Sequence, residues 1–305
     1  MKRVLSVSIG SSKRDKTYVG EFLGEEVEVG RKGTDGDMKK AGEVIAELDG
    51  QIDCFGLGGT DIYLWSSTRK YRIRDAWNVA KNARKSPIVD GGEIKHTLER
   101  QVIRDLANVH GIIQKGDPAL LVSGVDRIGM AEALDEIGCD TVYGDFLFAL
   151  RINRPIRSLR ELNRVAAMLL PIMTKLPFKM LYPTGKKQEE FKPRFPEQFQ
   201  RAKVVAGDFH YIRKYMPLDM SGKIIVTNTT TADDVELLRE RGVKTLVTTT
   251  PRMGDRSFGT NVLQALIVAL SGRRPEEMGW DDYLEYIRKM DLKPSVQELG
   301  YGGEG

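Results

Sequence analysis

The stretch that decides the fold is ALLVSGVDRIGMAEALDEIGCDTVYGD, residues 119–145. An apolar run suited to a buried strand comes first, a turn containing glycine follows, and an Ala- and Leu-rich helix then ends at Gly138. A second apolar run leads to an acidic residue, Asp145. Strand, turn, helix and strand in this order are typical of a Rossmann-like nucleotide-binding unit. We therefore predict an α/β protein whose second half is built on a mostly parallel sheet.

The turn in this stretch bears on the ligand. In dinucleotide-binding folds the turn is G-x-G-x-x-G and an acid lies about 20 residues further on. Gly124, Asp126 and Gly129 occupy the three positions, and Asp145 follows at the expected distance. A carboxylate at Asp126 opposes a bound anion at the start of the helix, where a pyrophosphate would lie. The pattern thus supports the fold and a cofactor site at these four residues, and the alternative is a plain β–α turn with Asp126 as a helix N-cap.

The alternation of short β-branched runs with amphipathic stretches continues along the chain and favours a largely parallel sheet covered by helices. Two segments, 16–33 and 61–74, alternate apolar and polar residues as antiparallel hairpins do. The boundary is expected near His110–Asp117, which gives an N-terminal α/β domain with hairpins at 1–115 and a Rossmann-like domain at 116–305. Eight βα-like units can also be counted, so a (β/α)8 barrel is the alternative fold. The expected strands are Val4–Ser8, Ile52–Leu57, Pro87–Asp90, Ala119–Ser123, Thr141–Asp145, Lys203–Ala206, Lys223–Asn228 and Lys244–Thr249, with a further one near residue 178.

Composition narrows the class of protein. The 305 residues include 47 basic and 43 acidic side chains, a net charge of +4 without a concentrated basic face, so a nucleic-acid partner is not expected. The apolar stretch at the N-terminus is shorter than a secretory signal needs, and no apolar run is long enough to cross a bilayer. Two isolated cysteines, and no H-x-x-x-H or carboxylate cluster, give no reason to expect a disulfide framework or a metal site. These features predict a cytoplasmic protein.

Polar residues gather where three of the expected strands end, and ligands of parallel sheets bind beyond the carboxyl ends of the strands. Asp208 and His210 follow one strand, and His210 beside a carboxylate is the candidate general acid/base. Asn228 and Thr229 follow the next strand, and Thr249 the one after it, as candidate cofactor contacts. An earlier turn, Asp90–His96, contains two glycines and Lys95, but a simple turn is the preferred interpretation there, and His96 is expected on a helix surface.

The segments KIIVTNTTTADDVELLRERGVKTLV (223–247) and SFGTNVLQALIVALSGRRPEE (257–277) resemble the closing section of the shikimate/quinate dehydrogenase family, in which bacterial proteins catalogued as quinate 5-dehydrogenase are also found. The resemblance covers about the last third of the chain. It implies a substrate contact at Gln264, and the string GTDGD (33–37) resembles the segment of the family's catalytic aspartate, which implies that role for Asp35. It also implies NAD or NADP as cofactor. The family's serine-rich substrate motif and catalytic lysine segment are not recognisable.

Three classes of function follow. The first is an NAD(P)-dependent oxidoreductase that acts on a small hydroxylated or carboxylated substrate held between the domains. The second is a transferase that uses a nucleotide or S-adenosylmethionine on the same scaffold. The third is a non-catalytic ligand-binding protein. A small-molecule partner is expected in all three, no membrane partner is expected, and a homodimer is left open.

Overall fold

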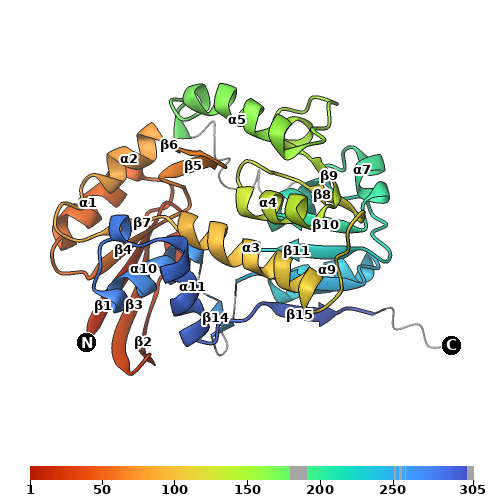
Figure 1. The fold of residues 1–305 in the computed structure, drawn as a ribbon. Helices are drawn as coiled ribbons and strands as arrows, with labels where there is room; N and C mark the ends of the chain where they lie inside the picture. The colour runs from red at the N-terminus through yellow and green to blue at the C-terminus, as the bar shows by residue number, and fades with distance from the viewer. Residues whose placement is uncertain (179–190, 251, 254–255, 258, 301–305) are drawn as a thin grey trace.

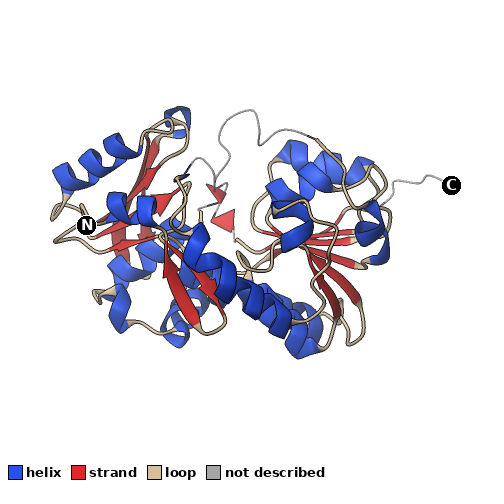
Figure 2. Ribbon diagram, turned by 90° about the horizontal axis from the view of Figure 1, so that it is seen from above, coloured by secondary structure: helices blue, strands red, loops and turns tan. Residues whose placement is uncertain are grey.

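The computed structural model describes residues 1–178, 191–250, 252–253, 256–257 and 259–300. It confirms the predicted α/β architecture with two sheets, one in each half of the molecule (Figures 1 and 2). The described strands of neither sheet close into a ring, so the barrel alternative is wrong.

The first sheet has the strand order β2-β3-β1-β4-β7. Strands β3, β1, β4 and β7 run parallel, and β2 is an antiparallel edge strand that forms the predicted hairpin with β3. The second predicted hairpin is a separate ribbon of β5 and β6. The bounds are β1 Lys2–Ser8, β2 Lys16–Phe22, β3 Glu25–Gly33, β4 Cys54–Gly58, β5 Tyr63–Ser66, β6 Arg69–Arg72 and β7 Ile88–Val89.

The second sheet has the order β9-β8-β10-β11-β12, extended by β15 at its edge. The first five strands are parallel, and in chain order they read 2-1-3-4-5, one of the doubly wound arrangements. Strand β15 pairs antiparallel with β12. The bounds are β8 Pro118–Leu121, β9 Asp140–Tyr143, β10 Val204–Gly207, β11 Ile224–Thr227, β12 Thr245–Thr248 and β15 Ser295–Glu298, with a two-residue ribbon of β13 Arg252–Met253 and β14 Arg256–Ser257. Residues 179–190, where much of the strand expected near 178 would fall, lie outside the described residues.

Helices cover the sheets and begin where the sequence signals them. Ser158 accepts a hydrogen bond from the Glu161 N–H, and Thr231 forms a complete capping box with Asp234, as the patterns S-x-x-E and T-x-x-D at these positions indicate. The α-helices are α1 Met38–Leu48, α2 Arg74–Ala80, α3 Gly92–Asn108, α4 Ile128–Ile137, α5 Leu159–Met173, α7 Pro196–Arg201, α8 Phe209–Tyr215, α9 Ala232–Glu240, α10 Thr260–Ser271 and α11 Trp280–Lys289. Short helical turns span Ser12–Arg14, Asp145–Ala149 and Pro275–Glu277.

Helix α10 follows the second sheet in sequence but packs on the first, against β1 and β4. Its side chain Gln264 is buried and accepts a hydrogen bond from the Gly91 N–H at 2.7 Å, while its amide donates to the Tyr283 hydroxyl at 3.2 Å. The chain then returns to the second sheet as β15. One apolar cluster runs through α3 from Val4 of the first sheet to Val226 of the second, so α3 joins the two halves.

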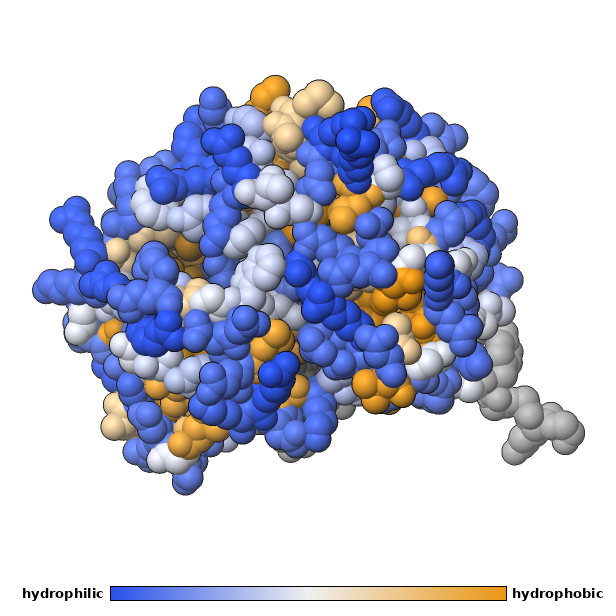
Figure 3. All heavy atoms as spheres, in the orientation of Figure 1, coloured by the Kyte–Doolittle hydropathy of each residue, from blue (hydrophilic) through white to orange (hydrophobic). Residues whose placement is uncertain are grey.

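The face of the molecule in Figure 3 is mostly hydrophilic, with separate small apolar areas. Within the described residues, no helix combines the length and the apolar character that a membrane span requires.

Gly91, at the turn into α3, provides a test of how closely α10 packs. Its φ is +91°, and an added Cβ would lie 2.5 Å from the Asn261 nitrogen and 2.5 Å from the Thr260 hydroxyl. We expect Gly91→Ala to lower the free energy of unfolding in urea by more than about 2 kcal/mol, because left-handed backbone strain adds to a backbone clash. Gly111→Ala, at φ +65° with open space around it, carries the backbone cost alone and should lose only about 1–2 kcal/mol. Equal losses would contradict the packing of α10 against this turn.

Candidate functional site

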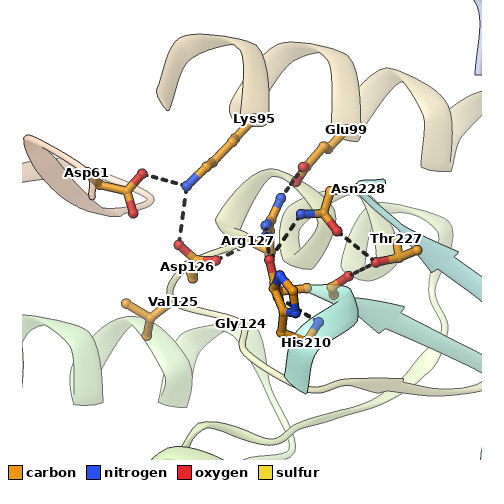
Figure 4. A network of polar contacts seen from close by, with 12 residues as sticks. Asp61, Lys95, Glu99, Gly124, Val125, Asp126, Arg127, His210, Thr227 and Asn228 are labelled. Atoms are coloured by element: carbon orange, nitrogen blue, oxygen red, sulfur yellow. Dashed lines mark hydrogen bonds and ion pairs between the residues drawn. The ribbon is translucent and has the colours of Figure 1, made fainter. Parts of the chain in front are cut away.

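Lys95, on the first turns of α3, lies between carboxylates from both halves of the molecule (Figure 4). Its Nζ is 2.6 Å from Asp61 Oδ1, in the loop after β4, and 3.5 Å from Asp126 Oδ1, in the turn after β8. The Lys95 side chain is 16% exposed. Because β4 and β8 belong to different sheets, this one ammonium group bridges the two sheets at the carboxyl ends of their strands.

Arg127, next to Asp126, extends the network into the second half of the molecule. Its guanidinium forms ion pairs with Glu99 of α3, with Asp126 at 3.1 Å and with Asp208 at 2.9 Å. Asp208 Oδ2 also accepts a hydrogen bond from the Asn228 side chain at 3.1 Å. Two cations therefore pair with four carboxyl groups in this cluster.

The charges in the cluster shift one another's pKa values. Burial opposes the charged form of Lys95, but the carboxylates of Asp126 and Asp61 outweigh it and raise the pKa of the amine. Burial raises the pKa of Asp61, whereas at Asp126 the nearby Lys95 and Arg127 overcome the same effect and lower the pKa. Burial raises the pKa of Glu99 to about 7 against the opposing field of Arg127. At neutral pH Lys95 is therefore a fixed cation and Asp126 a fixed anion.

A small, partly open cavity of about 10 Å³ lies beside Lys95, which is room for about one water molecule. Its wall includes Asp61, Trp65, His96 and Asp126. The Trp65 and His96 rings lie 4.3 Å apart between centroids. The Trp65 indole nitrogen and the His96 Nδ1 are both buried and have no hydrogen-bond partner among the described residues. Since buried polar atoms are nearly always hydrogen-bonded, these two atoms indicate a place where another molecule donates or accepts.

The predicted nucleotide turn is occupied by the protein itself. Asp145 accepts hydrogen bonds from the N–H groups of Gly124 at 2.9 Å and Val125 at 3.0 Å, so this carboxylate closes its own β–α turn. Burial raises the pKa of Asp145 to about 6, which those two N–H groups oppose. An added Cβ on Gly129 would lie 2.7 Å from the His96 carbonyl oxygen, so glycine here permits α4 to pack against α3. Asp126 is held by Lys95 and Arg127, and no anion-binding turn results.

The candidate residues after β10, β11 and β12 are only partly brought together. Asp208 caps α8 by accepting the His210 N–H at 2.9 Å, and the exposed His210 imidazole forms no hydrogen bond with the described residues. Asn228 joins the Arg127 network through Asp208. Thr229 is half-buried, outside the contacts of that network, and the Thr249 hydroxyl is buried without a partner in the described chain.

The two residues taken from the family resemblance lie elsewhere. Asp35, at φ +53°, accepts hydrogen bonds from the backbone N–H and the hydroxyl of Ser12, and these lower its pKa. It belongs to an exposed turn and has no contact with the Lys95 cluster. Gln264 is buried with both ends of its amide occupied by Gly91 and Tyr283, which makes it a bridge between α10, α11 and the turn into α3.

No sequence pattern had indicated Asp61, Trp65, Glu99 or Arg127 as site residues. The expected surface position of His96 is wrong, since His96 is 5% exposed. Lys95 lies in the segment for which a simple turn was the preferred interpretation. The available signal was the polar residues directly after two glycine-rich strand ends, GGTD (58–61) and DGGEIK (90–95).

Two family models match the chain. A model described as a domain of unknown function, DUF8753, covers residues 3–90, and one described as a domain of unknown function, DUF8754, covers residues 93–299. The chain belongs to the DUF8754 family. The two matches meet at the turn into α3, just before Lys95. A search of the curated proteins found no match.

Several solved structures are similar over almost the whole chain. An arabinose-binding protein from Geobacillus stearothermophilus is 10% identical with a TM-score of 0.42, over 98% of this chain and 97% of its own. A periplasmic solute-binding protein of an ABC transporter from Actinobacillus succinogenes, with bound D-allose, is 10% identical with a TM-score of 0.38, over 98% of both chains. At these values the likeness carries no argument about the ligand of this chain.

These findings correct four predictions. The resemblance to shikimate/quinate dehydrogenases is wrong: the matching family models are described as domains of unknown function, and the similar solved structures are described as arabinose-binding and solute-binding proteins. The predicted oxidoreductase function and the predicted NAD or NADP cofactor are therefore wrong as well. The physical reason is that Asp145 accepts the N–H groups of its own turn and Asp126 is paired with Lys95 and Arg127. The cytoplasmic prediction has no support in the comparisons, in which one similar solved structure is that of a periplasmic protein.

The burial of His96 has a measurable consequence. Burial, helped by the Arg100 and Lys95 cations, lowers the pKa of His96 to about 3 from its usual 6.5. The contribution of the neutral His96 ring to the free energy of unfolding is therefore fully present above pH 6.5. It is lost as the pH falls toward 3, because the unfolded chain binds the proton at a higher pH than the folded protein does.

The variant His96→Phe keeps a ring beside Trp65 and cannot titrate. Between about pH 6 and pH 4 we expect the unfolding free energy of the wild type to fall by up to about 1.4 kcal/mol per pH unit more than that of His96→Phe. Urea unfolding across this range measures both, and His110→Asn, in an exposed turn, should follow the wild type. Parallel curves for the wild type and His96→Phe would contradict the buried, neutral imidazole.

Proposed function

We propose that this protein binds a small, uncharged, hydroxyl-bearing molecule between its two sheets and does not transform it. The observation that carries the proposal is the cavity beside Lys95, whose wall includes Trp65 and His96, together with the burial of Trp65 Nε1 and His96 Nδ1 without partners among the described residues. Each such orphaned atom costs about 1–3 kcal/mol, which a ligand's hydroxyl groups would offset.

The chemistry of the wall favours hydroxyl groups over other polar groups. Asp61 and Asp126 accept hydrogen bonds, Lys95 and the Trp65 indole donate them, and a hydroxyl group can do both. An anionic ligand would meet the two carboxylates, and a cationic one would compete with Lys95 for them. The Trp65 and Tyr63 rings add flat apolar surface to the same wall.

The groups in the wall are poorly suited to acid–base catalysis near neutral pH. The pKa of Lys95 is raised, and that of His96 is lowered to about 3, so neither exchanges protons readily at pH 7. Glu99, whose pKa of about 7 would suit that role, does not line the cavity and is held by Arg127. These properties support a binding role.

A cavity of about 10 Å³ is too small for any such ligand. Binding therefore requires the two halves to separate on the side of Lys95 and Asp61 and to close again around the ligand. The continuous apolar cluster through α3 keeps the halves together on the other side and makes that helix the expected hinge.

A screen of thermal stability tests the proposal. Pentoses, hexoses, sugar alcohols, nucleosides and amino acids are added one at a time, and we expect at least one hydroxyl-rich compound to stabilise the protein by roughly 2.7 kcal/mol at 100 times its dissociation constant. Trp65→Phe keeps the ring but removes the indole N–H, and should weaken binding of that compound about tenfold or more. Trp77→Phe, on α2 and outside the cavity wall, is the matched control and should bind as the wild type does. No stabilisation by any compound, or equal binding by the Trp65 and Trp77 variants, would refute the proposal.

A further inference from the structure

A second, larger hollow lies next to the cavity. It is an open groove of about 640 Å³, within the roughly 300–1,000 Å³ of typical ligand pockets. Its lining combines the β5–β6 turn at Ser67 with side chains of α3, α4, α5 and the start of α11, among them Arg100, Asp135, Asn163 and Trp280. Both halves of the molecule thus contribute to it.

One aromatic stack forms the shared wall of the groove and the cavity. The His96 ring lines the cavity, and the Trp280 ring lines the groove. Their centroids lie 5.9 Å apart with the planes inclined by 8°, and Trp65 packs on the same histidine. The stacked His96 and Trp280 side chains thus connect the lining of the cavity to the lining of the groove.

We propose that the groove is an outer subsite of the same binding site and that the ligand is a carbohydrate of at least two sugar rings, with one ring held on Trp280. The inference rests on the proposed function, because it assigns the inner ring to the cavity beside Lys95. It names the ligand class, which the cavity alone does not.

Trp280 provides the surface that a sugar ring needs. It is 39% exposed, a large exposure for an aromatic side chain that also packs on its neighbours. A pyranose has an apolar face of C–H groups, which packs against a flat ring such as an indole. The Arg100 guanidinium lies 4.7 Å from the same ring, and its Nε is buried without a partner among the described residues.

The charges of the groove point to a neutral ligand. Three carboxylates and two guanidinium groups line it, which leaves an excess of a single negative charge and excludes strong attraction of polyanions. The two groups available for hydroxyls are Asp135 and Arg160, both exposed and without an ion pair in the described part of the chain. One accepts hydrogen bonds and the other donates them, as the alternating hydroxyls of a sugar require.

We expect the groove to close in the same motion that closes the cavity. Asn163 of α5 donates to the Ser67 hydroxyl at 2.9 Å and accepts the Ser67 N–H at 2.9 Å. These two hydrogen bonds tie the β5–β6 ribbon to α5, which lies above that ribbon in Figure 1. A ligand that touches Trp280 and Trp65 together would stabilise the closed arrangement of both halves.

Titration calorimetry with matched pairs of sugars tests the inference. Glucose, galactose and arabinose are compared with maltose, cellobiose and lactose on the full-length protein. We expect at least one disaccharide to bind at least tenfold more tightly than its component monosaccharides. Trp280→Ala should remove that excess, measured as the ratio of the monosaccharide to the disaccharide dissociation constant in the same variant, and Trp77→Ala is the control that should keep it. Asp135→Asn, an exposed and near-isosteric change, should weaken the disaccharide about threefold or more and keeps the test valid if Trp280→Ala does not fold.

The outcomes separate this inference from the proposed function. Equal affinity for monosaccharides and disaccharides, or an excess that survives both groove variants, overturns the outer subsite but leaves the cavity as a binding site. Binding of a non-sugar from the thermal screen without binding of any sugar overturns the carbohydrate assignment alone. Absence of binding by every compound overturns both.

Discussion

The salt bridges of Lys95 are the interaction on which the arrangement of the two halves depends. A buried ammonium group is tolerated only when carboxylates compensate it, and the compensation here comes from Asp61 on one side and Asp126 on the other. Removal of the amine would take a shared cation away from the largely buried Asp61 and from the partly exposed Asp126, and loss of one partner of a buried ion pair is strongly destabilising. These ion pairs hold the loop after β4 and the turn after β8 together in the closed arrangement, and the cavity forms between them.

A second constraint fixes the opposite side of the molecule. Helix α10 lies on the first sheet although it follows the second in the chain, and Gln264 ties it to the turn into α3 at Gly91. Because α3 also carries Lys95, Glu99 and His96, the same hydrogen bond positions the helix that supplies half of the candidate site. Apolar packing around α10 and α3 holds the molecule together on one side of the cleft, and the Lys95 ion pairs hold it on the other. A cleft built in this way can open at the ion pairs while the apolar packing keeps the fold.

The sequence predicted much of the fold because its signals are local. Short β-branched runs and capping residues such as Ser158 and Thr231 define elements within a few residues, and the alternation of strands with helices indicates a mostly parallel sheet. Two features were missed, the edge strand β15 and the return of α10 to the first sheet. Both depend on contacts between residues far apart in the chain, as between Gln264 and Gly91, which no local pattern records.

The site was harder to predict than the fold. Asp126 and Asp145 stand at the spacing of a nucleotide-binding turn, but spacing does not show that Asp145 accepts the turn's own N–H groups or that Asp126 pairs with Lys95. The expected strand ends did meet near Asp208 and Asn228, yet their partner Arg127 lies in another turn. Only the three-dimensional arrangement distinguishes a carboxylate that is free to bind a ligand from one that is already paired with a neighbouring cation or N–H group.

The central claim is that the two halves close around a ligand at Lys95, and a distance measured across the cleft tests it most directly. Spin labels at Lys39→Cys on α1 and Glu236→Cys on α9, both exposed, would be placed in a Cys139→Ser background and studied by double electron–electron resonance. The account predicts a broad distribution of distances without ligand and a single, shorter distance with the compound that gives the largest thermal stabilisation. The same distribution with and without that compound would contradict it.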